Sequence, residues 1–183
     1  EQYLWSYKRW KHSRERSVLI LSDGKTGHLR QSQAVAKIVE RLGFDVKTKV
    51  VEIRFKNRLS RVLLYFCVCL LPRVSMRTCL KYILTEDCYN QMLVDFSDII
   101  ISCGASLAGV NIIASFENKA KAIHILRPGL WLSKKFDLLV IPKHANLSRY
   151  KNIVWTCGAL NLIDEPYLKE QAEKLLQAVG CRL

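Results

Sequence analysis

A short apolar run leads directly into the hexapeptide DGKTGH, and a helical pattern follows. The run spans 18–21, the hexapeptide extends from Asp23 to His28, and apolar residues then recur with helical period over 31–42. This order predicts a strand, a tight polar turn and a helix start. In α/β proteins, anions and substrates bind at this kind of junction.

The turn carries residue types that suit a phosphate group. Gly24 and Gly27 let the backbone turn sharply and approach a ligand, while exposed amides and Lys25 supply positive potential. His28, at the helix entrance, titrates near neutrality. The hexapeptide is not a Walker A loop, because Leu19 stands where that motif requires glycine, and it is not GxGxxG. An ordinary connecting turn whose histidine packs or caps is the alternative.

The rest of the chain alternates expected strands with expected helices. The expected strands are 18–22, 46–53, 99–101, 122–126, 138–141 and 153–156. The expected helices are 31–42, 107–116 and 165–179, with one or two more over a basic apolar segment broken at Pro72. The pattern predicts a doubly wound α/β, Rossmann-like domain with a mainly parallel sheet over 17–183, preceded by a basic, aromatic segment over 1–16.

Polar clusters follow the expected strands at their carboxyl ends. After DGKTGH these clusters are CGAS (103–106), RPG (127–129), PKH (142–144) and TCGA (156–159). The carboxyl ends of parallel strands share one edge of the sheet, and ligands bind in the crevice there. Convergence of five loops on one edge favours a binding site over isolated turns.

The net charge of +13 implies an acidic partner, and much of the excess lies in one segment without acidic residues, between Glu52 and Glu86. Its basic residues flank ten consecutive apolar residues, 62–71, too few to span a bilayer. We therefore predict docking on an anionic membrane surface through Arg58, Arg61, Phe66 and Arg73. A buried helix with solvated basic flanks is the alternative. Nucleic acid is not expected as a partner, because the aromatic residues do not alternate with the basic ones.

The cysteines and histidines indicate no metal centre. Seven cysteines form an odd number without a CxxC pair, so we predict reduced core residues. The four histidines are scattered, which argues against zinc, and His124 lies inside an expected strand as a core residue. No DxD-like acidic pair occurs near the polar loops, so neither metal nor cofactor is expected.

Taken together, DGKTGH with Gln31, CGAS, RPG, a strand ending in PKH and a strand ending in TCGAL resemble a known family over residues 18–165. It is the family named for a plant mitochondrial fission factor, whose many bacterial members look like glycosyltransferases of the two-Rossmann-domain (GT-B) type. The first motif is also similar to the Gly-rich loop of the enzyme that adds N-acetylglucosamine to the lipid-linked peptidoglycan precursor. That enzyme binds its acceptor on the amino-terminal domain and docks on the membrane through an apolar patch with basic neighbours.

The resemblance implies the acceptor-binding, amino-terminal half of a glycosyltransferase that acts on a lipid-linked or phosphorylated acceptor. The nucleotide-sugar donor would bind mainly to a second domain, absent from this chain or present as a separate subunit, so we expect this chain alone to be inactive. The implied location is cytoplasmic, peripheral on the inner face of the membrane. A non-enzymatic membrane-docking or interaction protein is the alternative function.

Glycosyl transfer needs a base beside the acceptor hydroxyl and positive or hydrogen-bonding groups on a diphosphate. The resemblance makes His28 the expected base, with Asp23 as either the alternative base or the group that orients His28. Arg127 and His144 suit structural roles equally well. The residues expected to bind substrate or phosphate are Gly24, Lys25, Thr26, Gly27, Gln31, Gly104, Ser106, Arg127, His144 and Gly158.

Overall fold

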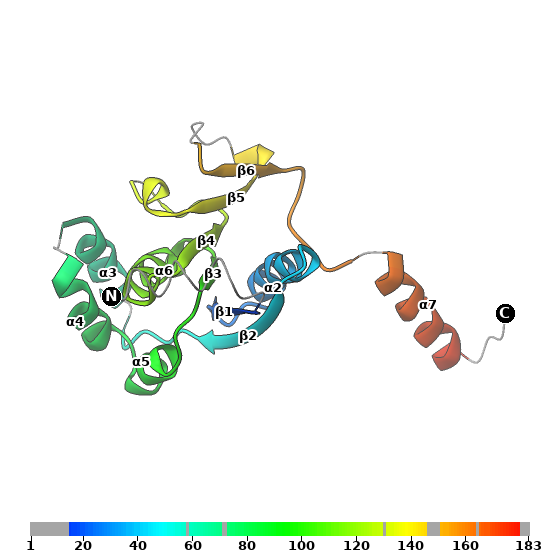
Figure 1. The fold of residues 1–183 in the computed structure, drawn as a ribbon, viewed down its shortest axis with the longest axis horizontal. Coiled ribbons are helices and arrows are strands. Elements are labelled where there is room, and N and C mark those ends of the chain that lie inside the picture. Colours follow the sequence, from blue (N-terminus) through cyan, green and yellow to red (C-terminus); the bar gives the residue numbers. More distant parts are fainter. Residues whose placement is uncertain are drawn as a thin grey trace.

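The computed structural model describes residues 15–57, 59–70, 73–129, 131–145, 151–163 and 165–179. The strands are β1 (Glu15–Ser22), β2 (Asp45–Glu52), β3 (Ile99–Cys103), β4 (Lys121–Ile125), β5 (Leu138–Pro142) and β6 (Ile153–Thr156). They form one parallel sheet in the order β2-β1-β3-β4-β5-β6 (Figure 1). The predicted doubly wound, Rossmann-like α/β fold is confirmed. Most of the predicted segment 1–16 lies outside the described residues.

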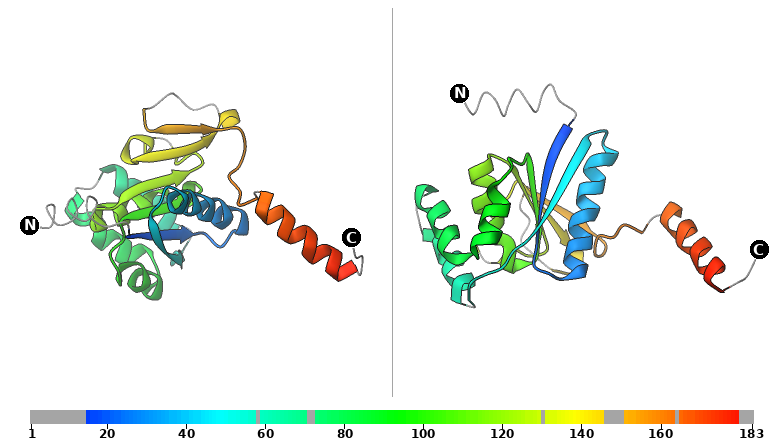
Figure 2. Two further views of the ribbon diagram at one scale, coloured as in Figure 1. Left: turned by 45° about the vertical axis from the view of Figure 1, so that its right-hand side comes forward. Right: turned by 90° about the horizontal axis from the view of Figure 1, so that it is seen from below.

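Helices cover both faces of the sheet (Figure 2). They are α2 (Thr26–Arg41), α3 (Leu59–Leu70), α4 (Arg73–Ile83), α5 (Glu86–Leu93) and α6 (Ala105–Asn118). The described chain also contains α7 (Glu165–Val179) and the short 3-10 helices η1 (Ser133–Lys135) and η2 (Lys143–Ala145). Alternate strand residues point to opposite faces. Val18 and Ile20 accordingly belong to the hydrophobic core on the side of the sheet covered by α2. Leu19 and Leu21 belong to the core on the opposite side, which α6 covers.

The basic apolar segment forms two helices, α3 and α4, on either side of Leu71 and Pro72, which lie outside the described residues. One side of α3 packs on α6 so closely that a Cβ added at Gly109 would lie 2.9 Å from the Leu64 Cγ. The opposite side of α3 stays in solvent. Its apolar residues there are Leu59, Val62, Leu63, Phe66 and Leu70. The helix is therefore neither a wholly buried core helix nor a wholly exposed one.

The prediction that all the cysteines are reduced is wrong. Cys67 on α3 and Cys79 on α4 form a disulfide, with their Cα atoms 7.0 Å apart, because the two helices pack against each other and bring these side chains together. The prediction of core positions is also only partly correct. Among the other described cysteines, Cys88 and Cys103 are buried thiols, whereas Cys69 and Cys157 are exposed.

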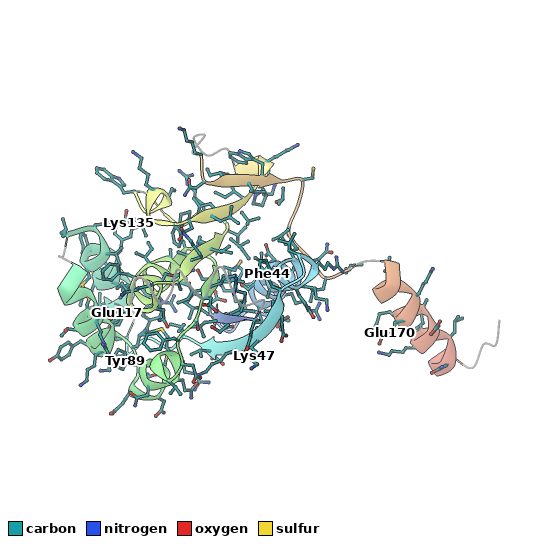
Figure 3. The ribbon with its side chains drawn as sticks, in the orientation of Figure 1. Phe44, Lys47, Tyr89, Glu117, Lys135 and Glu170 are labelled. Atoms are coloured by element: carbon teal, nitrogen blue, oxygen red, sulfur yellow. A yellow bond between two sulfur atoms is a disulfide. The ribbon has the colours of Figure 1, made fainter. Side chains whose placement is uncertain are left out.

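The sequence predicted one of the two remaining helices, α7, but not the other, α5. We expected no helix over Glu86–Leu93, where the structure has α5. The closing helix was expected over 165–179 and is confirmed as α7, which projects away from the sheet (Figures 1 and 3). Its ion pair between Glu170 and Lys174, spaced i,i+4, is local to the helix.

A buried network of hydrogen bonds connects α6 to strands β3 and β4. Asn111 of α6 donates from Nδ2 to the Ser102 Oγ, 2.7 Å away, and to the Ile123 carbonyl oxygen, 2.8 Å away. The Ser102 Oγ also lies 2.7 Å from His124 Nδ1. Which of the two atoms donates in this contact depends on the tautomer of the imidazole, and the other ring nitrogen, Nε2, is buried without a hydrogen-bond partner among the described residues.

The His124 imidazole is completely buried and stacks on Phe136, with their ring centroids 4.9 Å apart. Its predicted core position is confirmed. Burial, together with the smaller electrostatic effect of the neighbouring His28, lowers the pKa of His124 to about 3. The ring therefore stays neutral throughout the physiological range.

This depressed pKa predicts a loss of stability in mild acid. Between the unfolded pKa near 6.5 and the folded pKa of about 3, only the unfolded chain protonates His124, so acid favours unfolding. The free energy of unfolding should fall with decreasing pH by up to about 1.4 kcal/mol per pH unit from this group. We expect His124→Phe to flatten the slope of denaturant-derived stability between pH 6.5 and 5, where most carboxylates remain charged. An equal slope in both proteins would contradict a neutral His124.

Candidate functional site

The polar turn after β1 is held by its own side chains. Gly24 adopts a left-handed backbone angle, φ 81°, and its amide donates to the Ser22 Oγ over 3.2 Å. The Lys25 amide donates to Asp23 Oδ1, also over 3.2 Å. These two amides thus have intramolecular acceptors. The positive potential that remains at this junction comes from the Lys25 side chain and from the first turn of α2, which contains no acidic residue and receives no side-chain cap from Lys25.

Asp23 and His28 form a hydrogen-bonded pair. His28 Nδ1 lies 2.9 Å from Asp23 Oδ2, and the side chains are 22% and 11% exposed, respectively. An ionised carboxylate only accepts hydrogen bonds, so the His28 proton belongs on Nδ1 and the lone pair on Nε2. Lys25 Nζ lies 3.6 Å from the same Asp23 oxygen, and its side chain is 71% exposed. The pair is therefore a carboxylate-oriented imidazole beside a mobile cation.

Gly104, after β3, packs directly against the His28 ring. A Cβ at Gly104 would lie 2.8 Å from His28 Cε1 and 3.0 Å from Nδ1, and the residue has φ 91°. Two constraints therefore favour glycine at position 104: the left-handed backbone angle, and the His28 ring, which leaves no space for a Cβ. This contact joins the DGKTGH and CGAS loops into one site, as their strand ends predicted.

Two helix starts meet at this contact. Gly104 is the N-cap of α6 and provides no side-chain cap, and the first turn of α6, which includes Ser106, has no acidic residue. The start of α2 has the same character and carries exposed Thr26 and Gly27. Both helix dipoles therefore direct positive potential toward the Asp23–His28 pair, which suits an anionic ligand.

The remaining predicted site residues lie less close to the pair. Arg127, His144 and Gly158 are exposed after β4, β5 and β6, at the same edge of the sheet. Across the described part of the chain, no hydrogen bond or ion pair joins these three to Asp23 or His28. Gln31 lies on α2, one turn beyond His28, and its buried Oε1 has no hydrogen-bond partner among the described residues.

The structure adds neighbours that the sequence analysis missed. Glu52 Oε1 would lie 3.7 Å from a Cβ at Gly24, and Arg54 Nε lies 3.2 Å from that same oxygen. Glu52 could have been predicted to lie here, because it ends β2 and the carboxyl ends of parallel strands share one edge of the sheet. Cys103 also lies near Asp23, but burial, reinforced by the negative charge of Asp23, raises its pKa to about 12, so it remains a thiol.

The described ranges contain no cluster of three or more His, Cys, Asp or Glu residues that could hold a metal ion. The same ranges contain no helix with the length and apolar character needed to cross a membrane.

Comparison with known proteins gives one match. A family model described as "Mitochondrial fission ELM1" matches residues 26–181. The matched region starts within the DGKTGH turn and extends past the loops that follow β3, β4, β5 and β6. No curated protein and no solved structure matches the chain.

Gly104→Ala should displace the His28 ring and weaken its hydrogen bond to Asp23. Gly43→Ala is the matched control, because Gly43 has nearly the same backbone angle, φ 89°, but nothing within 4 Å of its added Cβ. Both variants should lose stability through backbone strain, of about 1–2 kcal/mol. Only Gly104→Ala should change the imidazole resonances of His28 in long-range ¹H–¹⁵N spectra. Identical His28 spectra in the two variants would contradict the packing described.

Proposed function

The chain belongs to the mitochondrial fission ELM1 family, and we propose that it is the acceptor-binding half of a glycosyltransferase. The proposed acceptor is lipid-linked or phosphorylated, and the proposed donor is a nucleotide sugar held by a further domain or subunit. The observation that carries the proposal is the Asp23–His28 pair, 2.9 Å apart, at the convergence of two helix starts. This arrangement combines a base with an anion site, the two requirements of glycosyl transfer.

In the proposed reaction, His28 Nε2 accepts the proton of the acceptor hydroxyl as that oxygen attacks the anomeric carbon of the donor sugar. The bond from that carbon to the diphosphate oxygen breaks at the same time, and the nucleoside diphosphate leaves with the bonding electron pair. Asp23 keeps the Nδ1 proton in place and stabilises the imidazolium that forms, as a carboxylate does in other carboxylate–histidine pairs. His28 is only partly exposed, and its contacts with Asp23 and Gly104 hold the ring in one orientation. Asp23, which is occupied by His28 and Lys25, is better suited to orient the base than to replace it.

The anionic part of the ligand would lie against the starts of α2 and α6. Lys25 is the cation nearest the pair and can turn from Asp23 toward a phosphate, because its side chain is largely exposed. Thr26 and Ser106 add hydroxyl donors at the two helix starts. Arg127, exposed on the loop after β4, could contact a second phosphate.

The exposed side of α3 supports peripheral attachment to a membrane. Val62 and Phe66 present an apolar stripe that no described element covers, and Phe66 is 53% exposed. Arg61, exposed on the same helix, lies with its guanidinium 5.3 Å from the Phe55 ring centroid. The predicted contacts Arg58 and the Arg73 side chain lie outside the described residues. We propose that α3 rests on the anionic inner face of a membrane, in the cytoplasm.

A second candidate function is a membrane-docking protein without enzymatic activity. The same exposed stripe on α3 favours it, because a docking surface needs no base. It predicts membrane binding without affinity for a diphosphate. Diphosphate binding therefore distinguishes the two candidate functions, since only the glycosyltransferase half is expected to show it.

Lys25→Ala should weaken diphosphate binding without unfolding the chain. The probes are inorganic pyrophosphate and geranyl diphosphate, measured by calorimetry, and loss of one close cation should weaken binding about 5–10-fold. Lys37→Ala is the control, since Lys37 is a lysine of the same helix that pairs with Glu40. The proposed anion site would be contradicted if wild type, Lys25→Ala and Lys37→Ala bound these probes with equal affinity, or if none of them bound.

Membrane attachment is tested by vesicle flotation. Phe66→Ser with Arg61→Glu should lower partitioning onto anionic vesicles at least tenfold, because each basic residue near such a surface contributes about 1 kcal/mol. Leu42→Ser with Arg41→Glu makes the same chemical change at an exposed leucine at the end of α2. This control should float as wild type does. A wild-type chain that stays with the soluble fraction at low salt would refute attachment through α3.

A further inference from the structure

Trp131 combines two unfavourable features. Its side chain is 85% exposed, and its backbone lies in the left-handed region at φ 72°, which non-glycine residues rarely adopt. An indole is the largest apolar side chain, so its exposure leaves a substantial aromatic area in water. Residues held in this way cluster at binding sites and ligand contacts.

The described residues that precede and follow Trp131 include buried ones. Leu132 and Ser133, directly after it, are buried, and Pro128, before it, is buried as well. The Lys135 amide donates to the Leu132 carbonyl oxygen over 2.9 Å, which closes the turn of η1. The described residues near Trp131 on both sides are therefore packed, whereas its own indole lies in solvent.

The same segment is attached to α3 at two points. A Cβ at Gly129 would lie 3.7 Å from Tyr65 Cε2, and Lys135 Nζ donates to the Val68 carbonyl oxygen over 2.6 Å. Lys135 lies beside α3 in Figure 3. Trp131 stands between these two attachments in the chain, so it is carried at the flank of the helix that has the exposed apolar stripe.

Charge around Trp131 has the sign that an anionic surface requires. Between Glu117 and Asp137 the chain has no acidic residue, and Arg127 and Lys134, on either side of Trp131, are exposed. The segment between Glu52 and Glu86, which contains α3, is also free of acidic residues. Two acid-free basic segments, distant in sequence, thus adjoin each other in the fold.

We propose that Trp131 is a second membrane anchor, inserted among the headgroups of an anionic bilayer beside the α3 stripe. Indoles favour the membrane interface, where one part of the ring is apolar and its N–H remains hydrated. This proposal rests on the membrane attachment put forward above and extends it to the substrate edge. The loop that carries Arg127 ends at Trp131, so the anchor holds that loop at the lipid surface. The acceptor would then be a lipid-borne molecule that reaches the site from the bilayer.

Tryptophan fluorescence tests the anchor directly. The triple variant Trp5→Phe, Trp10→Phe, Trp155→Phe leaves Trp131 as the single tryptophan, which is excited selectively over the tyrosines at long wavelength. A matched variant keeps Trp155 of β6, which is partly buried, and replaces the other three. With vesicles of phosphatidylcholine and phosphatidylglycerol, Trp131 emission should shift to the blue and be quenched at least twofold by brominated lipid. Trp155 emission should change little.

Trp131→Gly provides a variant that should still fold, because glycine adopts φ 72° without strain. It should unfold at the same or a higher denaturant concentration than wild type, yet partition onto vesicles about tenfold less. A variant that binds vesicles as wild type does would overturn the proposal.

The outcomes separate the anchor from the membrane attachment itself. A chain that floats with vesicles while Trp131 remains unquenched retains attachment through α3 and refutes the anchor. A chain that does not float refutes both. If Trp131 emission responds to pyrophosphate or a nucleotide sugar but not to vesicles, the indole contacts soluble ligand and the anchor is again refuted.

Discussion

Parallel pairing of β1 with β3 is the constraint on which the site depends. The register runs from Val18 opposite Ile99 to Leu21 opposite Ser102, so the two strands leave the sheet at the same level. Because β2 lies on the other side of β1, the connections after β1 and β3 lead to strands on opposite sides, which is the strand order at which open α/β sheets bind ligands. Only this pairing places Gly104 against the His28 ring, and a strand order with β2 between them would separate the two motifs.

The same edge shows how environment assigns different roles to two histidines. His124 is enclosed between Ser102 and Phe136, shares a hydrogen bond through Nδ1 with the Ser102 Oγ, and has its pKa lowered to about 3. His28 is partly exposed and donates from Nδ1 to a carboxylate. A positive charge on His28 would further disfavour protonation of His124, so proton chemistry is confined to the outer ring. The His124 ring packs in the core, and the His28 ring is the one that a ligand can reach.

The sequence predicted the six strand positions and the loops that meet at the edge, because alternation and apolar runs report burial directly. It did not predict contacts that depend on packing between distant segments, such as Gly104 against His28, Glu52 beside Gly24, or the disulfide of Cys67. Helix α5 had a local signal that was overlooked. Thr85 at its N-cap precedes Glu86 and Asp87, which favour a helix start.

In helix α3, the apolar run in the sequence does not predict which side of the helix is buried. Leu64 and Val68 pack on α6, while Val62 and Phe66 face solvent, although all four belong to one unbroken run. A continuous run has no periodicity to distinguish a buried side from an exposed one, so the division depends on the close approach of α6 at Gly109. The exposed stripe therefore follows from the fold, not from the composition of the helix. Since α3 begins just beyond the end of β2 and its Tyr65 lies near the Gly129 position in the loop after β4, the helix that carries the stripe lies close to the carboxyl edge of the sheet.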